Sequence, residues 1–273
     1  MFRDILVHVK PTEASSPHEG TAAALALACG ARLTGLATLR EVSVLKMLHR
    51  RNPEAAAERI ELAYRQASEA ERRFRACAAA AGVSCDWQVA EGDAAEILAV
   101  AARYHDLTVV EQTDPSADEI GFDVPETCVM ASGRPVLVLP NARGFDRVGR
   151  SVVVAWNGSR EAAAALHGAL PFMERAERVL VLQGRSRATY ASVTRWPPLD
   201  VAATLRARGV AVSVETVGDD DDAGAAILAA AGHASADLVV MGAYGRSWMS
   251  EWILGGATRH VLRHMAVPVL MAH

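Results

Sequence analysis

The sequence has no strong excess of either charge. Of its 273 residues, 28 are Lys or Arg and 32 are Asp or Glu, which gives a formal net charge of −4 at pH 7. A protein that binds DNA or RNA as its main partner usually carries a basic surface, because it must neutralise phosphates. Nucleic acid is therefore not expected as a partner of this chain.

Cysteines are few and do not form a recognisable metal or disulfide pattern. The four cysteines, Cys29, Cys77, Cys85 and Cys128, all lie in the first half of the chain. They include no Cys-x-x-Cys pair and no companion histidines at zinc-finger spacing. We expect neither a disulfide framework nor a structural zinc site.

Long apolar runs are missing as well. The apolar stretch near the N-terminus covers only residues 5–9 and contains His8, so it lacks the apolar core of a signal peptide. The most apolar long window, residues 21–39, is interrupted by glycines, an arginine and a threonine. We expect no membrane segment, and a reducing cytoplasm is the expected compartment.

Motifs of common enzyme classes are absent. The sequence contains no G-x-S-x-G, no G-x4-G-K-[ST] and no H-E-x-x-H. His260 and His264 are spaced to share one face of a helix, but no third metal ligand is evident nearby. The acidic run 219–222 is better explained as a solvated loop that favours the start of a helix. These patterns predict no catalytic residues and no metal site.

The two halves of the chain resemble each other. Short apolar runs, each followed by a turn or a helical segment, recur in the same order. The matching segments are 4–10 with 151–157, 106–110 with 237–241, and 133–140 with 266–273. Two copies of one unit are predicted, one at residues 1–142 and the other at 150–273.

Apolar runs of strand length alternate with segments of helical period in both copies, which predicts an α/β fold. We expect two doubly wound open sheets, each of about five mainly parallel strands. In the second copy, the predicted strands are Val152 to Ala155, Val179 to Leu182, Val210 to Val214, Leu238 to Met241 and Val267 to Met271.

Several residues predict where helices begin and end. Ser159 is a predicted N-cap, with Glu161 in the first turn, and Gly209 is placed to end a helix at residues 199–208. In the first copy, Asn52 and Pro53 predict the start of a long helix that ends at Gly82. Its predicted buried stripe consists of Ile60, Tyr64, Ala67, Phe74 and Cys77.

A glycine-rich loop follows the strand predicted at residues 238–241. Gly242 and Gly245 allow tight turns and a close approach to a ligand, and Gly255 and Gly256 lead into a helix. The free N–H groups at a helix start, next to a glycine-lined loop, favour an anion such as phosphate. The alternative is that these glycines serve only as turn and helix-entry residues.

The spacing G-x2-G-x9-G, carried by Gly242, Gly245 and Gly255, resembles the nucleotide loop of the universal stress protein family. Arg246 and Ser247, Val261 to His264 and Val267 to Leu270 are also similar to that family. The resemblance extends over both halves and implies a tandem universal stress protein. Members usually pair through their last strands, which implies an intramolecular pseudo-dimer through residues 135–139 and 268–271. A homodimer of the whole chain is left open.

The resemblance implies an adenine nucleotide, such as ATP, bound in the second half. The implied site residues are Ala155, Trp156, Asn157, Met241, Gly242, Gly245, Arg246, Gly255, Gly256, Ala257 and Thr258. Arg259 is a further candidate for contacting phosphate. Trp156 is placed either to stack on a base or to pack at the sheet edge.

Two positions depart from the pattern of nucleotide-binding members. Gly256 stands where those members have Ser or Thr, and the next hydroxyl is that of Thr258. Losing one hydrogen bond to phosphate costs roughly 1.5–3 kcal/mol. Asn157 stands where they usually have Asp, and an amide is a poor Mg²⁺ ligand. Weaker nucleotide binding, with Mg²⁺ bound weakly if at all, is therefore expected.

The first half has lost the glycine loop. Glu111, Asp114 and about Val124 stand at the places of the three glycines, and Lys10 replaces the acid at the end of the first strand. Since carboxylates repel phosphate, no site is expected at this place, and the first copy is predicted to serve architecture and pairing unless its long helix shelters a different ligand.

The resemblance implies a cytoplasmic stress-response protein, non-catalytic or nearly so, that binds ATP or another adenine nucleotide in its second half. Two alternatives are open: a slow ATP hydrolase, and a nucleotide-free stress scaffold that acts through unidentified protein partners.

Overall fold

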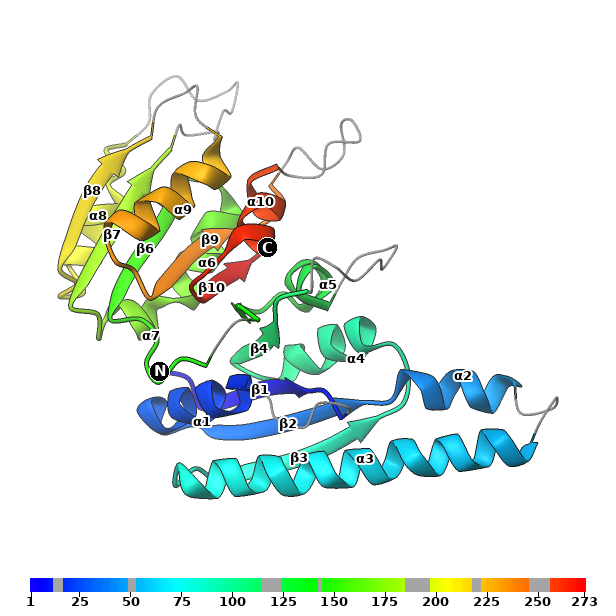
Figure 1. Cartoon of the computed structure of the whole chain (residues 1–273). Coiled ribbons are helices and arrows are strands. Elements are labelled where there is room, and N and C mark those ends of the chain that lie inside the picture. Colours follow the sequence, from blue (N-terminus) through cyan, green and yellow to red (C-terminus); the bar gives the residue numbers. More distant parts are fainter. Residues whose placement is uncertain are drawn as a thin grey trace. The chain divides into compact units, whose positions relative to one another are not determined.

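The computed structural model describes residues 1–11, 17–48, 53–113, 124–141, 144–184, 197–217, 222–245 and 256–273. The chain forms two compact units, which we call unit 1 (Met1–Asp146) and unit 2 (Arg147–His273). Both are shown in Figure 1. Within the described ranges, no helix has the length and apolar character needed to span a membrane.

Unit 1 is an open parallel sheet with helices on both faces. Its elements are β1 (Asp4–Val9), α1 (Pro17–Cys29), β2 (Arg32–Thr38), α2 (Arg40–Leu48), α3 (Pro53–Ala80), β3 (Cys85–Ala90), α4 (Ala94–Ala101), the short 3-10 helix η1 (Ala102–Tyr104), β4 (Leu107–Glu111), α5 (Val124–Ser132) and β5 (Val136–Leu139). The strand order is β3-β2-β1-β4-β5, with parallel pairs throughout. Helix α1 packs beside α3, and α4 packs beside α5.

Unit 2 repeats this arrangement. Its elements are β6 (Ser151–Trp156), α6 (Arg160–Gly168), α7 (Leu170–Met173), β7 (Arg178–Gln183), α8 (Val201–Arg206), β8 (Val212–Thr216), α9 (Ala223–His233), β9 (Leu238–Gly242), α10 (Gly256–His264) and β10 (Val269–Ala272). The strand order is β8-β7-β6-β9-β10, again with parallel pairs. The predicted α/β fold with mainly parallel strands is confirmed, and each of the five strands expected in the second half is present. The pairing of residues 135–139 with 268–271 stays a prediction.

The helix ends of unit 2 follow from short polar side chains. Ser159 caps α6 and accepts a hydrogen bond from the N–H of Ala162, as predicted. Gly209 has a φ of 80°, which suits its predicted place after a helix. The helix itself is shorter than predicted, because Asp200 caps it and accepts hydrogen bonds from the first N–H groups of α8.

The long helix α3 begins at Pro53, as predicted, and Asn52 lies outside the described residues. The predicted buried stripe is only partly right. Ala67 and Phe74 are buried, but Tyr64 is 40% exposed. Its hydroxyl donates to Glu91 instead of lying in the core. The reason is visible in Figure 1, where the first part of α3 runs beside α2 and beyond the sheet.

Two further members of that stripe, Ile60 and Cys77, are half-buried. Ile60 packs against a small cluster formed by Leu39, Val42 and Ala67 rather than against the sheet. The fully buried positions on α3 are mostly alanines, which the sequence pattern undervalued because alanine also favours exposed helix surfaces.

A matching aspartate supports the first strand of each sheet. In unit 1 the carboxylate of Asp106 accepts hydrogen bonds from the N–H groups of Arg3 and Asp4. In unit 2 the carboxylate of Asp237 accepts from Gly149, Arg150 and Ser151. The two aspartates were aligned in the sequence repeat, and they satisfy equivalent backbone donors. The repeat therefore extends to individual side-chain contacts.

Candidate functional site

The candidate site lies where the strand order of unit 2 reverses. The chain proceeds from β6 through β7 to β8 in one direction and continues with β9 and β10 on the other side of β6. Ala155 and Met241 are paired near the carboxyl ends of β6 and β9. In open parallel sheets, ligands bind at the carboxyl ends of the strands at such a reversal.

Gly242 is required by packing at this edge. A Cβ added to it would lie 2.4 Å from the backbone nitrogen of Ala162 and 2.5 Å from the carbonyl carbon of Glu161. Both atoms belong to the backbone of α6, which cannot move as a side chain can. Gly242 thus allows β9 to lie close to α6. The role predicted for it was a close approach of the backbone to a ligand, which is a different role.

The turn after β9 leaves more room at Gly245. Tyr244 has a left-handed φ of 53°, so a non-glycine residue makes the sharp part of this turn. Gly245 is exposed, and the nearest atom to an added Cβ is a carboxylate oxygen of Glu161 at 3.7 Å. Of the two glycines in this turn, Gly245 is the one with space for a ligand.

Thr258 connects this turn to helix α10. Its side chain is buried, and its hydroxyl accepts a hydrogen bond from the N–H of Tyr244 at 3.4 Å. The start of α10 is more open: Gly256 is exposed, with no atom of the described residues within 4 Å of an added Cβ, and Ala257 is half-buried. Thr258 carries the hydroxyl that follows Gly256, where nucleotide-binding members have Ser or Thr. In this structure that hydroxyl already accepts a hydrogen bond from the turn after β9.

Asn157 follows β6 and forms part of the turn into α6. Its side-chain oxygen accepts a hydrogen bond from the N–H of Ser159 at 3.1 Å. Because this oxygen is engaged, the donor group of the amide is better suited to contact a ligand than the oxygen is. The preceding residue, Trp156, is half-buried, and its carbonyl accepts from the N–H of Gly184.

Glu161 places a negative charge beside the glycine turn. Its side chain is buried and accepts a hydrogen bond from the guanidinium of Arg160. Burial alone would raise its pKa, but the hydrogen bonds from Arg160 and from the backbone of α6 lower it below the usual range. The carboxylate is therefore ionised at neutral pH. The sequence indicated its place in the first turn of α6 but not its proximity to Gly245.

The structure thus brings most of the predicted residues to one edge of the sheet. Ala155, Trp156 and Asn157 lie at the end of β6 or just beyond it, and Met241 and Gly242 end β9. Arg246 and Gly255 lie outside the described residues, so their predicted contacts stay predictions.

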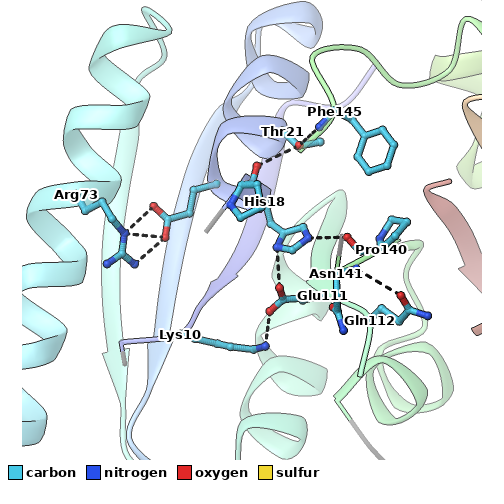
Figure 2. A network of polar contacts seen from close by, with 11 residues as sticks. Lys10, His18, Thr21, Arg73, Glu111, Gln112, Pro140, Asn141 and Phe145 are labelled. Carbon is cyan, nitrogen blue, oxygen red and sulfur yellow. Dashed lines mark hydrogen bonds and ion pairs between the residues drawn. The ribbon is translucent and has the colours of Figure 1, made fainter. Parts of the chain in front are cut away.

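The equivalent edge of unit 1 is occupied by its own side chains, as Figure 2 shows. Glu111 ends β4 and forms ion pairs with Lys10 and with Nδ1 of His18, the latter at 2.9 Å. Nε2 of His18 lies 2.9 Å from the carbonyl oxygen of Pro140. Glu111 and Lys10 are the residues expected at this edge from the sequence, whereas the contact with His18 was not predicted. Asp114 lies outside the described residues, and Val124 begins α5.

This cluster strongly perturbs its titrating groups. Burial would raise the pKa of Glu111, but hydrogen bonds from His18 and Lys10 outweigh it and lower the pKa to about 2. Burial would lower the pKa of His18, but its hydrogen bonds to Glu111 and Pro140 outweigh that effect and raise it. The nearby His8 behaves in the opposite way, since burial and the charge of Lys10 lower its pKa to about 4.

The histidine pair on α10 shares one face, as predicted. The ring centroids of His260 and His264 are 4.4 Å apart, and Nδ1 of His260 lies 3.4 Å from a carboxylate oxygen of Asp222. Asp222 also caps α9. Among the described residues, no group of three or more His, Cys, Asp and Glu side chains is arranged to hold a metal ion.

Comparisons with known proteins agree with this architecture. Residues 149–273, which lie in unit 2, match the model of the Universal stress protein family. No curated protein matches the sequence.

Solved structures match nearly the whole chain. A universal stress protein from Archaeoglobus fulgidus DSM 4304 is 18% identical, with a TM-score of 0.66, and the match covers 98% of this chain and 97% of that one. A candidate universal stress protein from Pseudomonas aeruginosa UCBPP-PA14 is 19% identical, with a TM-score of 0.58 and coverage of 99% and 93%. A protein of unknown function from Pseudomonas aeruginosa PAO1 is 19% identical, with a TM-score of 0.59 and coverage of 99% and 92%. At these identities the likeness is one of fold, and it includes unit 1.

Proposed function

We propose that the chain is a tandem universal stress protein whose unit 2 binds ATP or another adenine nucleotide. One observation carries the proposal. In the domain that matches the family, the exposed Gly245 of the turn after β9 lies at the edge where the strand order reverses, next to the carboxyl end of β6. Such an edge is the usual ligand site of a doubly wound sheet.

The groups available at this edge suit a nucleotide better than a bare cation. The open start of α10 supplies backbone N–H groups for phosphate, and the amide of Asn157 supplies a donor for a ribose hydroxyl. Asn157 is a weak ligand for Mg²⁺, so the metal would enter mainly through the nucleotide's own phosphates. Without a hydroxyl at Gly256, the affinity is reduced by about one to two decades.

Hydrolysis of the nucleotide is less well supported. A carboxylate oxygen of Glu161 lies 3.7 Å from the Cβ position of Gly245, and the lowered pKa of this group makes it a weak general base. The same negative charge favours the nucleotide-free scaffold, because it opposes phosphate at Gly245. A scaffold that acts through partner proteins in the cytoplasm, alone or as a homodimer, is therefore the second candidate function.

Isothermal titration calorimetry with ATP tests the proposal directly. We expect heat of binding with the wild type and little or none with Gly245→Asp, because the new carboxylate adds charge at an exposed position with room for a side chain. Gly242 is unsuitable for this test, since any side chain there collides with α6.

The unfolding curves of the wild type and of Gly245→Asp must agree. A loss of ATP binding can then not be attributed to a loss of folded protein. Absence of heat with wild-type protein up to millimolar ATP, together with no small molecule released on denaturation, would reject nucleotide binding in favour of the scaffold. ADP production by the wild type that Gly245→Asp abolishes would instead support slow hydrolysis.

A further inference from the structure

The segment that leads out of unit 1 is fastened to the first turns of helix α1. We call residues 140–141 and 144–146, which follow β5 and precede unit 2, the connecting segment. At its beginning, the carbonyl oxygen of Pro140 lies 2.9 Å from Nε2 of His18. Near its end, the N–H of Phe145 donates to the hydroxyl of Thr21 at 2.7 Å. Figure 2 shows both contacts.

A third contact brings the backbone of this segment against the same turn. A Cβ added to Gly144 would lie 3.0 Å from the carbonyl oxygen of Pro17, the first residue of α1. Three residues within the first five of this helix, Pro17, His18 and Thr21, thus contact the connecting segment. One of the three side chains, that of His18, can titrate near neutral pH.

The partners of His18 define its protonation state. Nδ1 faces the carboxylate of Glu111 and Nε2 faces the carbonyl oxygen of Pro140, and both of these groups only accept hydrogen bonds. A neutral imidazole has one N–H and can satisfy one of them. Both contacts are hydrogen bonds only when the ring carries two protons and is therefore positively charged.

The charged groups around His18 come from several elements. Glu111 at the end of β4 favours the charged ring, and Lys10 after β1 opposes it. The neighbouring Glu19 on α1 is paired with Arg73 of α3 at 2.8 Å, so its charge is balanced elsewhere. Because Glu111 contacts both cations directly, its carboxylate holds Lys10 and His18 together.

We infer that protonated His18 is a clamp that fastens the connecting segment to α1, and that the clamp opens when the imidazole loses its proton. The remaining ring proton then stays with the carboxylate of Glu111, which is the stronger acceptor. The carbonyl of Pro140 loses its donor and faces a ring nitrogen lone pair instead. The segment that joins the two units is held at low pH and released at higher pH.

Amide hydrogen exchange measured by NMR on the whole chain tests this clamp. The amides of Asn141 and Phe145 are suitable reporters, since they donate to Gln112 and Thr21 and lie in the connecting segment. Protection is expressed relative to the intrinsic exchange rate at each pH. We expect the protection of these amides to fall by about tenfold or more from about pH 6 to about pH 9.

Variants separate the clamp from general stability. In His18→Gln, which does not titrate, we expect low protection of Asn141 at both pH values. Thr21→Val removes the second contact, and we expect Asn141 to keep its pH-dependent step. His167→Gln changes a histidine whose Nδ1 contacts Ala163 within its own helix α6, and it should behave as the wild type does.

Nitrogen chemical shifts of the His18 ring give an independent readout, and they decide the matter even if His18→Gln fails to fold. The clamp is supported if both ring nitrogens of His18 are protonated at about pH 6. The ring must also lose a proton over the same pH range in which the amides of the connecting segment lose protection. A ring that is neutral at this pH, or protection that does not change across the range, overturns it.

Discussion

Glu111 and Gly242 occupy the same position in the two units, as the last residue of the strand that follows the reversal of strand order. In unit 1 the carboxylate of Glu111 binds Lys10 and His18. In unit 2 the absence of a side chain lets the backbone of α6 lie directly against β9. The same position thus carries an ion-pairing side chain in unit 1 and permits close contact with the backbone of α6 in unit 2.

The first prediction concerns Gly242. We expect Gly242→Ala to lower the free energy of unfolding by about 1–3 kcal/mol, because the new methyl group collides with the backbone of α6. Urea unfolding measures the change. Gly256→Ala is a matched control, since no atom in the described part of the chain lies within 4 Å of its Cβ position. Equal effects of the two substitutions would contradict the packing role of Gly242.

A second prediction concerns the charge of Glu161 and depends on nucleotide binding in unit 2. If phosphate lies near Gly245, Glu161→Gln removes a nearby negative charge, and we expect the Kd for ATP to fall by roughly threefold to tenfold. Adenosine, which carries no phosphate, should bind with unchanged affinity. Titration calorimetry with both compounds checks this, and a parallel change for adenosine would show that the effect is not electrostatic.

The ion cluster of unit 1 gives a third prediction. Glu111→Gln leaves His18 without its carboxylate, so we expect the free energy of unfolding near pH 6 to fall by about 1–3 kcal/mol. Glu177→Gln breaks an ion pair in which both side chains are 62% exposed, and it should cost much less, because water screens an exposed pair. Equal losses would indicate that the cluster contributes no more than a surface pair.

A fourth prediction concerns how the free energy of unfolding changes as pH rises, and it also depends on this ion cluster. The pKa of His18 is raised in the folded state, so its contribution to stability is complete below the unfolded value of 6.5 and is lost as pH rises through the folded value. We expect the wild type to lose this stability above pH 6.5, whereas His18→Gln does not. Urea unfolding at several pH values compares the two curves, and parallel curves would disprove the assignment.

His8 leads to a fifth prediction, on acidic pH. Its folded pKa of about 4 lies below the unfolded value of 6.5, so its contribution is present above 6.5 and is lost as pH falls toward 4. Between these values we expect the wild type to lose about 3 kcal/mol more than His8→Asn loses. A slope of unfolding free energy against pH that is unchanged in His8→Asn would exclude this histidine as the cause.

The strands were predictable because their residues are apolar on both faces and alternate with helical segments. Val152, Val179 and Leu238, for example, belong to buried runs that only a covered parallel sheet explains. The stripe on α3 was predicted less well. Tyr64 has the right spacing for burial, but spacing does not reveal that this part of the helix extends past the sheet.

The candidate site was predictable in place but not in detail. The glycine spacing located the edge, whereas the contact of Gly242 with α6 depends on how closely two elements approach. Likewise, His18 meets Glu111 and Pro140 from far along the chain. No local pattern in the sequence marks such a partner.

The role of Gly242 also bears on how related sequences should be compared. A glycine demanded by the contact between β9 and α6 will persist in copies of this domain that no longer bind anything, because its loss disturbs the fold. Gly245 is under no such restraint. Surveys that infer nucleotide use from the glycine motif would therefore discriminate better by weighting the second glycine above the first.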